Sequence, residues 1–131
     1  MVTTFYAAIS AILIMWLALQ VVKARRKNRI KYADGDVEEL QIVRTAHSNA
    51  IDNIPIAIIL LFLLEYNGCP IWLVHIFGLS LLTGRFTHSY GILKERMGGR
   101  VQGMRITVFT IISLAVFNLA FLPYDKFFML N

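Results

Sequence analysis

Hydrophobic residues are gathered along this chain into four long runs, separated by short polar segments. A helix crosses about 30 Å of hydrocarbon with roughly 20 residues, and the runs, with a more polar lead-in to the second, approach that length. The third run begins at Pro70 and continues past Leu82 into a polar helical end. The pattern predicts four membrane-spanning helices, over approximately residues 3–22, 38–66, 70–93 and 105–123.

The composition agrees with a membrane protein. Of the 131 residues 57% are hydrophobic, and the mean hydropathy of +0.62 lies well above that of a typical soluble chain. Four spans leave little chain for a soluble domain, so we expect residues 1–131 to form a single all-α membrane domain, a four-helix bundle. Because Cys69 is the only cysteine, no intrachain disulfide can form. Packing must therefore hold such a bundle together, and we expect oligomerisation to contribute.

The basic residues are expected to mark one side of the membrane. The formal net charge is +5, with six of the 13 cations between Lys23 and Lys31 and five more between Arg85 and Arg105. In a four-span chain the first and third connections face the same side, which the positive-inside rule assigns to the cytoplasm. We therefore expect a multi-pass protein with both termini on the non-cytoplasmic side. Its clustered charge fits contact with the lipid bilayer and argues against a nucleic-acid partner.

The second helix is expected to begin well outside the hydrocarbon. Acidic residues within 36–39 favour a helix start because they oppose the positive end of the helix dipole, which places the start near Val37. Pro55 is expected to interrupt this helix. The turn signal at residues 67–70 predicts that the second and third helices form an antiparallel pair. Three glycines are expected to break the chain between the third and fourth helices: Gly98, Gly99 and Gly103.

Ionisable side chains fall inside the predicted spans, where an Asp or Arg costs at least about 2.5 to 3.5 kcal/mol and needs a polar partner or a wet cavity. On the second helix, Asn49 shares a face with Asp52, and Arg44 lies alongside. Four ionisable residues are expected to form one layer, at the same depth near the cytosolic ends of three helices: Asp52, Arg85, His88 and Arg105. This layer suits a small, mainly anionic ligand that carries an amine, with a lipophilic second substrate entering from the bilayer.

The same residues also allow a purely structural interpretation. An ion pair between Asp52 and Arg85 or Arg105 would only fix the register of the helices. A metal site is not expected, because His47 and His75 have no paired His or Cys at ligand spacing.

Three motifs, in order along the chain, carry a resemblance to a known family. HSNAIDNIP begins at His47, GRFTH begins at Gly84, and MRITVF begins at Met104. Together with four spans and a basic first connection, they resemble the MAPEG family, the membrane-associated proteins in eicosanoid and glutathione metabolism. The likeness is nearest to small bacterial inner-membrane members. It implies an inner-membrane homotrimer of four-helix subunits that binds glutathione between subunits near the cytosolic face.

The resemblance also implies ligand-binding roles on the second and third helices. Asn49 and Asp52 match the family's Asn and acidic residue, and the acidic residue is expected to meet the glutamyl amine. Arg85 and His88 match the Arg and His of the third helix. These four residues are the expected ligand anchors.

Cations on other segments complete the expected site. Arg105 matches the fourth-helix Arg that stabilises the thiolate in glutathione-transferring members, which makes it the candidate catalytic residue. A thiol becomes more nucleophilic at neutral pH when a fixed cation stabilises its thiolate. Lys23 falls near a basic position at the end of the first helix, and Arg44 flanks the second-helix motif one residue away from the family's usual Arg position, which is Thr45 here.

The chain departs from the family pattern where hydroxyl groups are expected. A serine that often follows the fourth-helix Arg is Ile106, and a tyrosine three positions beyond is Phe109. A tyrosine four residues after the third-helix His is Ile92. These departures remove donors that would hold glutathione or its sulfur, so binding is better supported than turnover.

The function expected from these patterns is glutathione binding, with glutathione transferase or peroxidase activity towards lipophilic electrophiles. One alternative is a non-catalytic member of the same fold that binds lipid or acts as a scaffold. A second alternative is a small four-span exporter that uses Asp52 as a proton or cation site, although the first span, where such exporters usually carry their carboxylate, has no charge.

Overall fold

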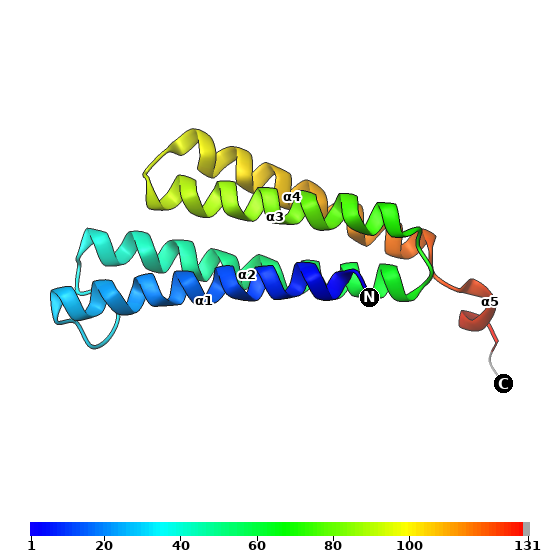
Figure 1. The fold of residues 1–131 in the computed structure, drawn as a ribbon, viewed down its shortest axis with the longest axis horizontal. Coiled ribbons are helices and arrows are strands. Elements are labelled where there is room, and N and C mark those ends of the chain that lie inside the picture. Colours follow the sequence, from blue (N-terminus) through cyan, green and yellow to red (C-terminus); the bar gives the residue numbers. More distant parts are fainter. Residues whose placement is uncertain (130–131) are drawn as a thin grey trace.

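A computed structural model of the chain describes residues 1–129 and confirms the all-α four-helix bundle. Two antiparallel helical hairpins lie side by side, and a short fifth helix projects from one end (Figure 1). The helices are α1 Thr3–Asn28, α2 Glu38–Tyr66, α3 Ile71–Leu93, α4 Met97–Ala120 and α5 Tyr124–Phe127.

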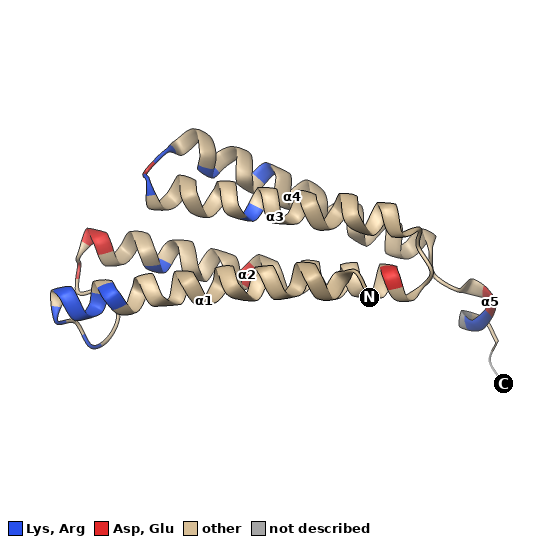
Figure 2. Ribbon diagram, in the orientation of Figure 1, with Lys and Arg blue, Asp and Glu red and all other residues tan. Residues whose placement is uncertain are grey.

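The bundle has two chemically different ends (Figure 2). The α1–α2 and α3–α4 connections lie together at the end where Lys and Arg gather, which we call the basic end. The α2–α3 connection, the N-terminus and α5 lie at the other end, which we call the terminal end. Between these ends α1, α2 and α4 are each long and apolar enough to cross a membrane, and α3 runs beside them in the same bundle.

The first hairpin differs in its connection from what we expected. Most of the basic residues from Lys23 to Lys31 lie in α1, which continues to Asn28, and only Arg29 and Lys31 lie in the connection. Cations in the last turn of a helix are favourable against the negative end of its dipole. Arg29 then ends the helix in a left-handed conformation, with φ of 55°. α2 starts at Glu38 directly after Val37, as predicted, and runs unbroken through Pro55 to Tyr66.

Glycines in the second hairpin pack helices together and do not break the chain. We expected the fourth helix to begin near residue 105, but α4 begins at Met97 and includes all three glycines that we had placed in the connection. A methyl group on Gly103 would overlap the backbone of His88, and one on Gly91 of α3 would overlap the backbone of Arg100. The absence of side chains therefore lets α3 and α4 approach closely at the basic end.

The core consists of two apolar clusters, one in each half of the bundle. The cluster nearer the basic end includes Leu13, Leu17, Ala50 and Ile54, all of which are buried. The outward faces of the long helices carry many exposed large apolar side chains, including Ile12, Leu19, Ile59, Ile76 and Val116. This arrangement suits a bundle surrounded by hydrocarbon, where exposed apolar side chains contact lipid.

At the terminal end of the bundle, a carboxylate near the end of α2 binds the start of α1. Glu65 of α2 accepts hydrogen bonds from the backbone N–H of Val2 at 2.6 Å and from the backbone N–H and hydroxyl of Thr3 at 2.8 and 2.6 Å. These N–H groups open α1 and would otherwise lack partners within the helix. Glu65 thus caps α1 from a neighbouring helix.

Candidate functional site

Arg85 on α3 is a buried cation between α2 and α4. Its side chain is 1% exposed. Nη1 donates to the side-chain oxygen of Asn49 at 3.0 Å, Nε donates to the Thr107 hydroxyl at 3.0 Å, and Nη2 lies 3.9 Å from the sulfur of Met104. All three partners are neutral. Within residues 1–129 the ion pairs are Lys27–Glu39 and Arg44–Asp34, so no described carboxylate balances Arg85.

Asn49 on α2 orients this arginine. Its backbone oxygen also accepts from Nη1 of Arg85 at 3.3 Å, and its side-chain oxygen accepts from Asn53 at 3.3 Å. The carboxamide oxygen is therefore fully used, while the amide N–H groups have no protein acceptor in the described chain. They remain available to a ligand.

His88, one helical turn beyond Arg85, has one engaged and one unpartnered ring nitrogen. Nδ1 lies 2.7 Å from the backbone oxygen of Arg100, so it carries the proton and donates it to this carbonyl. Nε2 is consequently an acceptor, and it is buried without a partner. The close approach allowed by Gly103 places the ring against α4.

Two open grooves meet at Asn49. The α4 groove has a volume of about 610 Å³ and is lined by Asn49, His88, Arg100, Val101, Met104, Arg105, Val108, Phe109 and Ile112. The α2 groove has a volume of about 460 Å³ and is lined by Asp34, Gln41, Arg44, Thr45, Ser48, Asn49 and Asp52. The α4 groove therefore has cations and an apolar wall, and the α2 groove has two carboxylates, one cation and neutral polar side chains.

The structure brings most of the predicted residues together. Asn49 and Arg85 are hydrogen bonded, and His88 and Arg105 share the α4 groove with Asn49. Asp52 and Arg44 share the α2 groove, where Arg44 also pairs with Asp34 at 3.6 Å.

One interpretation made from the sequence does not describe this chain. Asp52 forms no ion pair with Arg85 or Arg105 in residues 1–129, because its side chain is exposed on the outer face of α2 while Arg85 points inward to Asn49 and Thr107. The interpretation of Asp52 as the partner of Arg85 or Arg105 in a register-fixing ion pair within one chain is therefore wrong. Lys23 is exposed on α1 and lines neither groove of its own chain, so its place in a site between subunits stays a prediction.

Sequence reasoning missed Thr107. This buried residue lies two positions after Arg105, and its hydroxyl donates to the backbone oxygen of Gly103 at 2.9 Å while accepting from Arg85. A threonine one helical turn after a packing glycine was the available signal.

The arrangement favours an anion held by cations and recognised by neutral polar groups. No group of His, Cys, Asp and Glu within residues 1–129 has the geometry of a metal site. Where hydroxyl donors were expected, Ile92 is buried in the core and Phe109 lies exposed along the α4 groove. The groove wall at this point is therefore apolar.

Comparison with known proteins gives the same assignment as the motifs. The profile of the MAPEG family matches residues 3–122. The chain is 39% identical over 131 residues to the protein named Inner membrane protein YecN of Escherichia coli strain K12, and equally to that of Escherichia coli O6:H1, and both matches cover 100% of each chain. Three helices long and apolar enough to cross a membrane, a fourth helix in the same bundle, and a family match over nearly the whole length agree. The chain is a multi-pass membrane protein that belongs to the MAPEG family.

Proposed function

We propose that this protein binds glutathione, or a similar small thiol peptide, across the α2 and α4 grooves. On this proposal the glutathione carboxylates face Arg85 and Arg100, the glutamyl amine faces Asp52, and the sulfur faces Arg105. The family as a whole has glutathione-related functions, which supports this choice of ligand.

The observation that carries the proposal is the uncompensated charge of Arg85. A buried charge is costly unless it is paired, and the described chain pairs this one only with neutral oxygens and a sulfur. An anionic ligand in the adjoining groove would supply the missing charge. The unpartnered Nε2 of His88 and the free amide of Asn49 border the same groove and would add one acceptor and one donor.

The chemistry that fits the groove is thiolate activation. Arg105 is exposed within the α4 groove, where its fixed charge would stabilise the thiolate of bound glutathione. The wall formed by Val108, Phe109 and Ile112 would hold a lipophilic electrophile that arrives from the bilayer. The proposed activity is therefore glutathione transfer or glutathione-dependent peroxide reduction.

The proposal includes a homotrimer in the inner membrane, with the basic end in the cytoplasm. The name of the Escherichia coli relatives supports the inner membrane, and the clustered cations support the orientation. Lys23, which lines neither groove of its own chain, would reach a groove of the neighbouring subunit. A particle mass of three subunits in detergent is expected, and a monomer that still binds glutathione would contradict the intersubunit site.

Binding is tested by isothermal titration of glutathione into the detergent-solubilised protein. Asp52→Ala is expected to weaken binding through loss of the amine contact, and Arg105→Ala through loss of a cation. Lys126→Ala removes an equally exposed cation from α5 at the terminal end and serves as the matched control. Absence of glutathione binding to the wild-type protein would overturn the proposal.

Catalysis is tested separately, by glutathione conjugation of a generic aryl halide. Arg105→Ala is expected to lose activity even at glutathione concentrations that restore occupancy. Equal activity in the variant and the wild type would remove Arg105 from the mechanism.

A non-catalytic glutathione-binding or lipid-binding member is the second candidate. The apolar wall at Phe109, which offers no hydroxyl to the sulfur, favours it. Glutathione binding without conjugation or peroxidase activity would identify the first form, and thermal stabilisation by lipids but not by glutathione would identify the second.

A further inference from the structure

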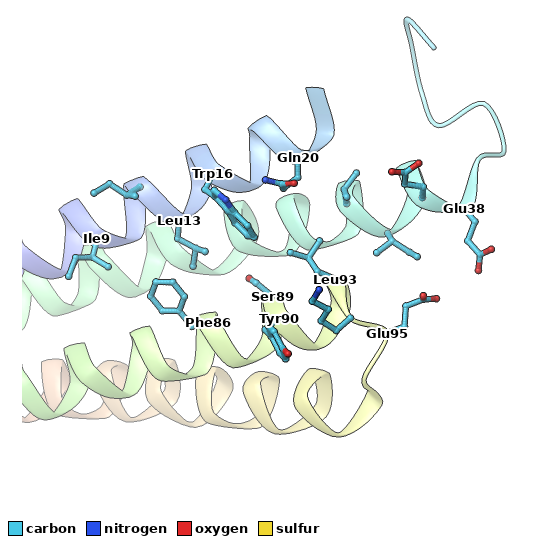
Figure 3. Close-up of a pocket in the computed structure, with 15 residues that line it drawn as sticks. Ile9, Leu13, Trp16, Gln20, Glu38, Phe86, Ser89, Tyr90, Leu93 and Glu95 are labelled. Carbon is cyan, nitrogen blue, oxygen red and sulfur yellow. The ribbon is translucent and has the colours of Figure 1, made fainter. Parts of the chain in front are cut away.

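A larger cleft lies between α1 and α3 and shares no lining residue with the two grooves. Its volume of about 1030 Å³ is at the upper end of the range for small-molecule sites. Figure 3 shows side chains from both helices directed into this cleft, among them Leu13 and Trp16 from α1 and Phe86 and Ser89 from α3. We call it the α1–α3 cleft.

Its wall is apolar in the interior of the bundle. Ile9, Leu13 and Phe86 line the deep part, and Trp16 lies nearer the basic end. Such a wall accommodates hydrocarbon chains, and it opens beside side chains such as Ile12 that are exposed on the outer face of α1.

Ser89 places a hydroxyl in this wall, which also includes the polar groups of Gln20 and Tyr90. Ser89 as a whole is 3% exposed, and its hydroxyl makes no hydrogen bond within residues 1–129. In Figure 3 it points into the cleft. The hydroxyl is therefore available to donate a hydrogen bond to an acceptor on whatever fills the cleft.

The mouth of the cleft carries both signs of charge. Glu38 at the start of α2 and Glu95 after α3 face each other across the opening (Figure 3), and Lys94 also lines it. None of these three side chains has an ion-pair partner in the described chain. Glu39, the remaining acidic residue of the lining, is already paired with Lys27 at 3.0 Å.

These groups follow one another in the order of the chemical groups of a phospholipid. At 1.5 Å of rise per residue, the α3 backbone at Ser89 lies about 7 Å below that at Lys94. From the mouth inward the cleft presents free carboxylates with an ammonium, then a hydroxyl donor, then hydrocarbon. A phospholipid with an amine headgroup presents an ammonium with a phosphate, then ester carbonyls, then acyl chains.

We propose that the α1–α3 cleft is a selective site for a phospholipid with a primary-amine headgroup, phosphatidylethanolamine, from the leaflet at the basic end. The headgroup ammonium lies between Glu38 and Glu95, the phosphate meets Lys94, and an ester carbonyl accepts from Ser89. A simple lipophilic amine would leave Lys94 without a counterion, and an anionic lipid without an amine, such as phosphatidylglycerol, would leave both carboxylates unpaired. This site does not depend on the glutathione proposal.

Two tryptophans make the test specific. Trp16 lines the cleft, whereas Trp72 lies exposed at the start of α3, near the terminal end. In the Trp72→Phe variant, Trp16 is the sole tryptophan and can be excited selectively, and lipids with brominated acyl chains quench it on contact. The protein is reconstituted in phosphatidylcholine vesicles with graded fractions of brominated phosphatidylethanolamine, phosphatidylcholine or phosphatidylglycerol.

From the quenching of Trp16, brominated phosphatidylethanolamine is expected to bind the cleft with about fivefold higher relative affinity than brominated phosphatidylcholine, whose headgroup has no N–H donor. Glu38→Gln and Glu95→Gln, singly and together, are expected to reduce this preference towards unity. Both positions are exposed, so either single variant can lose selectivity without losing the fold. Unchanged helicity by circular dichroism verifies that.

Trp16→Phe provides the matched control, because Trp72 then reports only the lipids that surround the bundle. Trp72 is expected to show no headgroup preference. Equal quenching of Trp16 by all three lipids, an equal preference at Trp72, or a preference that survives in the double variant would each overturn the proposal. So would a Trp16 that no lipid quenches, because the cleft would then be covered by another copy of the chain.

Discussion

A single guanidinium nitrogen of Arg85 bridges α3 to α2, donating to the side-chain oxygen of Asn49 at 3.0 Å and to its backbone oxygen at 3.3 Å. Both acceptors are neutral, so the contact positions the guanidinium without cancelling its charge. The amide of Asn49 therefore joins the two helices and leaves a net positive charge beside the α4 groove, whereas a carboxylate at position 49 would cancel that charge.

Asn49→Asp is expected to separate stability from ligand binding. A carboxylate at this place forms a charge-assisted pair with Arg85, which should raise the free energy of unfolding by about 1 kcal/mol. The same carboxylate cancels the charge offered to an anion, so glutathione affinity should fall by about tenfold or more. Thermal unfolding in detergent and isothermal titration measure the two effects.

Asn49→Leu is the companion variant. It leaves donors of Arg85 unsatisfied in a buried position, so we expect a loss of about 1.5 to 3 kcal/mol of stability. For the first variant, if Asn49→Asp binds glutathione as tightly as the wild-type protein does, the uncompensated charge of Arg85 does not attract the ligand.

Gly103→Ala is expected to destabilise the second hairpin. The added methyl group would overlap the backbone of His88, and forced separation of packed helices costs about 1 to 3 kcal/mol. Gly98→Ala is the matched control in the same helix, because nothing lies near its added methyl group. That control should gain about 0.5 to 1 kcal/mol from better helix propensity. Chemical unfolding followed by circular dichroism measures the free energy of unfolding of each variant. A change in the same direction in both variants would contradict this account.

Glu65→Ala is expected to free the start of α1. The carboxylate accepts three hydrogen bonds from Val2 and Thr3, and loss of such acceptors costs about 1 to 3 kcal/mol. Hydrogen exchange should become faster at the first turn of α1 and remain unchanged near the basic end. Asp125→Asn changes an exposed carboxylate at the same end of the bundle and should alter neither quantity. Unchanged exchange in Glu65→Ala would mean that the cap does not hold the helix.

The sequence was sufficient for the parts of this structure that repeat along a helix. Apolar runs of spanning length predicted the number of long helices, and acidic residues before an apolar run placed the start of α2 next to Val37. Helical spacing also placed Asn49 and Asp52 on one face, and both line the α2 groove.

Contacts between helices were less accessible from the sequence. A glycine such as Gly103 is compatible in the sequence with the end of a helix or with close packing inside one. Only its position against the backbone of His88 shows that it packs inside a helix. The choice of partner for Arg85 likewise depends on the rotation of each helix about its axis, which turns Asp52 outward and Thr107 inward. Glu65 was not singled out because its partners, the first residues of α1, are more than 60 positions away.

Phe109→Tyr tests whether the missing hydroxyl limits the proposed chemistry. Phe109 is 73% exposed and lines the α4 groove with Arg105, so a tyrosine fits there without repacking the core. Its hydroxyl would add one donor towards the bound sulfur, and one such hydrogen bond corresponds to about a tenfold gain in glutathione affinity or conjugation rate. Val116→Thr adds a hydroxyl to an exposed site on α4 that does not line the groove, and should change neither quantity. A gain in conjugation without a gain in binding would assign the hydroxyl to the thiolate, whereas no gain in either would show that the sulfur lies elsewhere in the groove.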